Sequence, residues 1–144
     1  MVNRQWSIGA MMNAAGFQQR TKQLAVRVNK MVEALPRNRS ADVIGRQLLR
    51  SATSVAANYR SACTAQSRAD MIRKLKIVEE EADESLLWME LLVESGLMNE
   101  AKLAALIQEM REILKMVIAS IKTLRRQKAT EDQKRLRQKP NNGQ

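Results

Sequence analysis

The sequence predicts an all-α protein, an antiparallel up-down-up-down four-helix bundle. Three observations favour this fold class: the 144 residues include only five glycines and two prolines, aromatic residues make up 3% of the chain, and apolar residues recur at helical spacing. A single domain is expected at this length. We expect a short N-terminal extension over residues 1–16, the bundle over residues 17–127 and a basic, flexible tail over residues 128–144.

The first two helices are expected at about residues 17–34 and 42–65. The first ends before Pro36, because proline disfavours a helical conformation in the residue that precedes it. Asp42 is a suitable N-cap for the second helix. At 100° per residue, one side of the second helix is apolar and the other carries arginines. The apolar side consists of Leu48, Leu49, Ala52, Val55, Ala56 and Tyr59, and the arginines are Arg46, Arg50 and Arg60.

The third and fourth helices are expected to run from Ser67 to about residue 94 and from Asn99 to about residue 127. Ser67 opens a sequence similar to a capping box, and Asn99 is the predicted N-cap of the last helix. Gly96 is expected to close the third helix. An apolar seam with spacings of four and three residues predicts shallow helix crossings. The seam consists of Met71, Leu75, Val78, Ala82, Leu86, Met89 and Val93.

A second apolar surface is predicted on the C-terminal half of the third helix. It comprises Leu87, Trp88, Leu91 and Leu92. A helix that is apolar on two sides must be covered on two sides. The cover is either the N-terminal segment with Trp6 and Met11 or a second subunit, for which Trp88 is a suitable anchor.

The charge distribution indicates partners with phosphate groups. The net charge is +10, and it is unevenly placed: residues 1–50 carry +7, residues 51–100 carry −4 and residues 101–144 carry +7. Arginine suits phosphate because its planar fork donates two hydrogen bonds. A solvated, solubilising tail is the alternative for the C-terminal run. The predicted phosphate contacts are Arg37, Arg39, Arg46, Arg50, Arg60, Arg125, Arg126, Lys134, Arg135 and Arg137.

Known catalytic motifs are absent from the sequence, and no cofactor or metal is expected. The chain has no histidine and a single cysteine, Cys63, for which a buried, inert thiol is expected. The acidic run 79–84 is expected to form a solvated or charge-paired surface, because consecutive carboxylates on a helix point in different directions. The alternative is a metal or acid–base site at Glu80, Asp83 and Glu84. No secretory signal or membrane-spanning segment is predicted, so the expected compartment is the cytoplasm.

Two stretches of the chain resemble a known family. Residues 50–62 read Arg-Ser-Ala-Thr-Ser-Val-Ala-Ala-Asn-Tyr-Arg-Ser-Ala and contain its Ser-Val-x-Ala-Asn core motif, and residues 67–92 are similar to its long third helix. This is the four-helix-bundle family of the proteins encoded by intervening sequences of bacterial 23S ribosomal RNA genes. The commonest continuation of its motif is Ile-Ala-Glu-Gly, whereas residues 59–62 here are Tyr-Arg-Ser-Ala, which makes this surface more basic.

The resemblance implies a homopentamer, and the intervening-sequence branch of the family has no established activity. It also implies a relationship to the accessory variability determinant of diversity-generating retroelements, a basic pentamer that binds the element's reverse transcriptase and nucleic acid. We therefore expect a nucleic-acid-binding accessory protein that contacts RNA or DNA through phosphates, with a reverse transcriptase as a candidate partner. The alternative is a protein–protein adaptor with no direct role in nucleic-acid binding.

Overall fold

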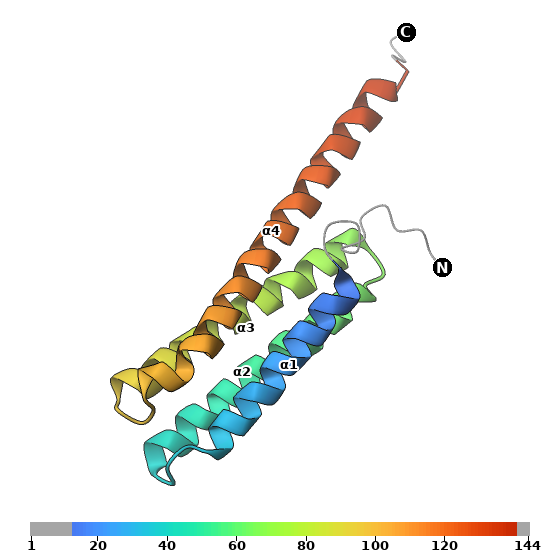
Figure 1. Ribbon diagram of the computed structural model, residues 1–144. Helices are drawn as coiled ribbons and strands as arrows, with labels where there is room; N and C mark the ends of the chain where they lie inside the picture. The colour runs from blue at the N-terminus through green and yellow to red at the C-terminus, as the bar shows by residue number, and fades with distance from the viewer. Residues whose placement is uncertain (1–12, 141–144) are drawn as a thin grey trace.

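Four helices pack side by side in the computed structural model, which describes residues 13–140 (Figure 1). The helices are α1 (Ala14–Glu33), α2 (Arg39–Cys63), α3 (Arg68–Glu94) and α4 (Glu100–Gln138). Successive helices run in opposite directions because the connections between them are short. No strand occurs within the described range. The predicted all-α four-helix bundle is confirmed.

Two predicted N-caps are confirmed by their hydrogen bonds. Ser67 Oγ accepts a hydrogen bond from the Asp70 N–H at 3.0 Å, at the start of α3. Asn99 Oδ1 accepts one from the Ala101 N–H at 2.8 Å, at the start of α4. In both cases a side-chain oxygen accepts a hydrogen bond from a backbone N–H group that has no partner within its own helix.

Gly96 ends α3 in the left-handed conformation, as the sequence predicted. Its φ is +70°. The Gly96 N–H donates to the Val93 carbonyl at 3.0 Å, and the Leu97 N–H donates to the Leu92 carbonyl at 2.9 Å. This pair of bonds is a Schellman motif, which favours glycine because a Cβ atom is strained at positive φ.

The helix boundaries differ from the prediction at three places. α1 begins at Ala14, so residues 14–16 belong to the bundle rather than to an extension. The N-cap of α2 is Asn38 and not Asp42: Asn38 Oδ1 accepts from the Ala41 N–H at 2.9 Å. α4 continues to Gln138, so residues 128–138 are helical and do not form a flexible tail.

The seam of α3 is buried as predicted from Met71 to Met89 and departs from the prediction at its end. Leu92 is 0% exposed and belongs to the core, whereas Val93 is only half-buried. The buried residues Met71, Leu75, Val78, Ala82, Ser85, Met89 and Leu92 follow one another at alternating steps of four and three. The core therefore keeps a strict seven-residue repeat, which reaches Leu92 and not Val93.

Polar contacts tie the helices together around the core. Ser51 of α2 and Ser85 of α3 are both 0% exposed, and their hydroxyl oxygens lie 2.7 Å apart in a hydrogen bond between the two helices. Arg20 of α1 pairs with Glu109 and Glu112 of α4, with Nη2 of Arg20 3.1 Å from Glu109 Oε2. α1 and α4, the first and last helices, are therefore joined by an ion pair at the surface.

Candidate nucleic-acid interface

Exposed positive charge is concentrated on the C-terminal part of α4. Beyond Leu124, the last buried residue of this helix, residues 125–139 contain seven Lys or Arg and two acidic residues. All seven basic side chains are exposed. We call residues 125–139 the arm. Its outer part extends past the ends of the other three helices (Figure 1). Residues 125–138 form about 20 Å of helix at a rise of 1.5 Å per residue.

An ion pair attaches the arm to the start of α3. Arg68, at the start of α3, places Nη2 2.7 Å from Oε1 of Glu131, and its side chain is only 12% exposed. The hydrogen bond from Arg68 holds the pKa of the Glu131 carboxyl below its ordinary value. Because Glu131 is engaged in this way, Asp132 is the remaining acid among the seven bases of the arm.

Half of the predicted phosphate contacts lie on the arm. They are Arg125, Arg126, Lys134, Arg135 and Arg137, and Lys128 and Lys139 accompany them. These two lysines were not among the predicted contacts, although they lie in the same basic run. At 100° per residue, Arg126 and Arg137 fall within about 20° of each other, on the side of the helix away from Glu131. Helix geometry therefore presents this pair to solvent.

Arg37 and Arg39 lie far from the arm. Arg37 lies in the connection between α1 and α2, and Arg39 is the first residue of α2. This connection is at the opposite end of the bundle (Figure 1). Both are exposed. The predicted phosphate contacts are therefore not one continuous surface within a single chain.

The arginines of α2 divide into two kinds. Arg50 binds α3, with Nη2 2.6 Å from Glu84 Oε1 and Nη1 3.3 Å from Glu81 Oε1. The hydrogen bond between Arg50 and Glu84 lowers the pKa of the Glu84 carboxyl and raises the pKa of the guanidinium. Arg46 and Arg60 are exposed, and neither forms a salt bridge with another residue of the 13–140 range. The arginine stripe thus includes one residue that links two helices.

The acidic run of α3 is partly charge-paired. Glu81 and Glu84 bind Arg50, and Glu79 lies 2.9 Å from Nζ of Lys76. The expected charge-paired surface is therefore present where α3 meets α2. Within the part of the chain that the structure describes, no group of three or more His, Cys, Asp or Glu residues is placed to hold a metal ion.

The outer apolar surface of α3 is smaller than predicted. Leu87 is 47% exposed. Trp88 and Leu91 are half-buried, and the Trp88 indole N–H donates to Glu84 Oε1 at 3.1 Å. Leu92 was wrongly assigned to this surface, because it lies in the core. We call Leu87, Trp88 and Leu91 the ridge. The alternative cover for this surface, the segment with Trp6 and Met11, lies outside the described residues.

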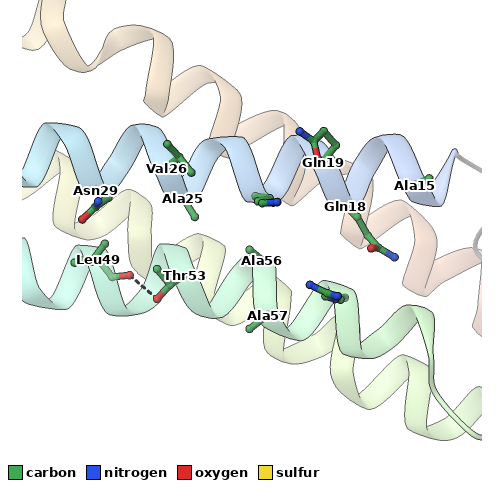
Figure 2. A pocket seen from close by; sticks show the side chains of 12 residues that line it. Ala15, Gln18, Gln19, Ala25, Val26, Asn29, Leu49, Thr53, Ala56 and Ala57 are labelled. Carbon is green, nitrogen blue, oxygen red and sulfur yellow. Dashed lines mark hydrogen bonds between the residues drawn. The ribbon is translucent and has the colours of Figure 1, made fainter.

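A groove of about 1070 Å³ lies between α1 and α2 (Figure 2). Small and aliphatic side chains from both helices form its floor, among them Ala25, Leu49 and Ala56, and Lys22 and Arg60 also line it. Thr53 lies between Leu49 and Ala56 along α2, and its hydroxyl donates a hydrogen bond to the Leu49 carbonyl at 2.7 Å. The groove was not predicted from the sequence, because its two walls come from different helices.

The single thiol is less buried than expected. Cys63 is half-buried near the end of α2 and lies beside the hydroxyl of Tyr59, which is itself 1% exposed. Burial raises the pKa of Tyr59 well above its ordinary value. The Tyr59 ring packs edge-on against Phe17 of α1, with 4.5 Å between ring centroids. Tyr59 therefore serves the core at the motif where this sequence departs from the commonest family pattern.

The helices of the described range are amphipathic. None of them contains a window that is long and apolar enough to cross a membrane.

The fold and its surfaces define a class, that of small, basic, all-helical bundle proteins. The chain belongs to the family of 23S rRNA-intervening sequence proteins, whose family model matches residues 16–119. This confirms the resemblance inferred from residues 50–62 and 67–92. The arm lies beyond the matched residues.

A solved structure from Bacteroides thetaiotaomicron VPI-5482 has the same fold. It is described as a protein with unknown function from the S23 ribosomal protein family. It is 35% identical in sequence with a TM-score of 0.72, and the match covers 77% of this chain and 99% of that chain. No curated protein matches this chain.

Proposed function

We propose that this chain is a non-enzymatic, nucleic-acid-binding accessory protein that works as a homopentamer. The arm is the observation that carries the proposal. It places seven exposed bases and two acids on the projecting end of α4 and on Lys139, which follows it. One of the two acids already binds Arg68, so the charge presented to a phosphate backbone is almost wholly positive.

The chemistry of the arm favours contact with phosphates over recognition of bases. Arginine and lysine side chains neutralise phosphates and release the counterions bound to them. Stacking on unpaired bases requires aromatic side chains, and residues 125–144 contain none. The proposed ligand is therefore a structured RNA or DNA that is bound with little sequence preference.

The proposed protein partner is a reverse transcriptase. This proposal rests on the resemblance to the accessory determinant of diversity-generating retroelements. A gene neighbourhood with a reverse transcriptase and paired template and variable repeats would support it. Co-purification of the chain with the reverse transcriptase of that neighbourhood tests it directly, and a failure of the two proteins to bind each other contradicts it.

The nucleic-acid proposal is tested by measuring affinity for a structured RNA and for duplex DNA over a range of salt concentrations. Seven phosphate contacts predict a slope of log K against log salt of about −6 on duplex DNA. The Arg126→Ala/Arg137→Ala variant is expected to reduce the magnitude of this slope by about 2. Arg27→Ala/Lys30→Ala is the matched control: both bases are exposed on α1, neither is a predicted phosphate contact, and the variant is expected to change the slope little.

Two results would contradict the proposal. One is the absence of binding at about 50 mM salt, where phosphate contacts are strong. The other is a salt slope that the arm variant and its control reduce equally, because charge would then act without regard to position.

A protein–protein adaptor is the second candidate function, and the ridge favours it. An exposed leucine beside a tryptophan is a feature of protein interfaces rather than of phosphate-binding surfaces. Purified protein that captures a specific protein partner and carries no nucleic acid would support the adaptor function and exclude the first proposal.

A further inference from the structure

The ridge of α3 combines an apolar centre with an acidic border. Leu87 is the most exposed of its three residues, at 47%. Asp83, Glu90 and Glu94 are exposed, and at 100° per residue they fall within about 60° of Leu87 around the helix. None of the three forms a salt bridge with another residue of the described chain. The carboxylates therefore remain available to a partner.

The groove between α1 and α2 has the opposite character. Its apolar floor is hollowed because Ala25 and Ala56 are small, and Val26 adds a side chain that is 46% exposed. Its charged lining residues, Lys22 and Arg60, are both basic, and neither forms a salt bridge within residues 13–140. Figure 2 shows Ala25 and Ala56 between the two helices.

We infer that the ridge of one chain docks into the groove of a second copy. Large apolar side chains on the ridge match small ones in the groove, and carboxylates around the ridge match the two cations of the groove. Charge complementarity of this kind selects the partner and fixes the register of an interface. The occupant of the groove is therefore α3 of a neighbouring chain.

The two surfaces lie on different helices, and this determines the form of the assembly. A contact between α3 of one chain and α1 and α2 of the next is head-to-tail, so each chain has one donor surface and one acceptor surface. Such heterologous contacts produce a ring when the rotation closes. The inference rests on the proposed homopentamer, for which it supplies the interface.

Two assembly-deficient variants test the inference when they are mixed. Leu87→Asp places a charge on the ridge, and Thr53→Trp fills the groove at an exposed position. Each variant alone is expected to weaken assembly at least about thirtyfold. A mixture keeps one intact ridge and one intact groove, so it is expected to give a one-to-one dimer and no larger species in light scattering.

Matched controls are available for both substitutions. Val43→Asp adds a charge at an apolar residue that is 59% exposed on α2, and Ala129→Trp adds an indole on the exposed arm. Both controls are expected to assemble like the wild-type chain. Circular dichroism and thermal unfolding establish that all four variants fold.

The outcomes separate this inference from the function on which it rests. A wild-type chain that is monomeric in light scattering contradicts both the pentamer and the interface. A wild-type oligomer whose two variants assemble normally, or give no dimer when mixed, overturns the interface alone. Folded variants that stay monomeric apart and pair one-to-one when mixed support it.

Discussion

Truncation of Leu92 should lower the free energy of unfolding much more than the same truncation at the outer surface of α3. Leu92 and Leu87 lie on the same helix, and one is 0% exposed whereas the other is 47% exposed. Leu92→Ala removes three buried carbon atoms, which costs about 2.4 kcal/mol at about 0.8 kcal/mol each. The cavity that remains raises the expected loss in the free energy of unfolding to about 3–4 kcal/mol. For 144 residues, this corresponds to a decrease in Tm of about 10–13 °C.

Leu87→Ala is the control for this prediction, because it makes the same chemical change outside the core. Urea unfolding followed by circular dichroism measures both variants, at several protein concentrations so that any contribution from assembly is visible. At low concentration, Leu87→Ala is expected to stay within about 0.5 kcal/mol of the wild-type chain. The assignment of Leu92 to the core is contradicted if Leu92→Ala is as stable as the wild-type chain, or if both substitutions lower the free energy of unfolding equally.

Three further predictions concern the helix ends and the ion pairs. Gly96→Ala should cost about 1–2 kcal/mol of unfolding free energy in a denaturant titration, because a Cβ atom is strained at a φ of +70°; an unchanged midpoint would contradict the Schellman assignment. Glu84→Gln should be less stable than the wild-type chain at neutral pH. Since Arg50 lowers the pKa of Glu84 in the folded state, this stability is fully present above the ordinary value of 4.5 and disappears as the pH falls through the lowered value. Stability curves that stay parallel down to the most acidic pH would refute it. Removal of residues 128–144 should reduce the total helical signal and leave a cooperative unfolding transition, whereas an unchanged helical signal would mean that these residues are not helical.

Local sequence signals predicted the helices and most of their ends. Ser67, Asn99 and Gly96 act through hydrogen bonds with neighbours only a few residues away, so the sequence alone identifies them. Asn38 carries the same kind of signal as Ser67, and it was overlooked in favour of Asp42. This error came from the choice between two residues that both favour N-caps.

Long-range contacts account for what sequence reasoning missed. The apolar periodicity of α4 ends near residue 127, and this predicted a flexible tail. The helix continues because the arm is rich in residues that favour helices and because Arg68, 63 positions away in sequence, binds Glu131. Likewise, the position of Arg50 on α2 predicted a solvent-facing charge, but its partners lie on α3. Pairings of this kind depend on how two helices meet.

The direction of the arm has a consequence for binding strength. In any cyclic assembly of this chain, rotation about the axis relates the arms, so all of them make the same angle with the axis and end at the same height. A single long nucleic acid could then touch several arms in succession, and each contact after the first would be intramolecular. Effective concentrations in the millimolar range are typical of such linked sites, and they raise the overall avidity by about 10²–10⁴ without any new contact. A modest affinity of one arm would thus become tight binding by the ring.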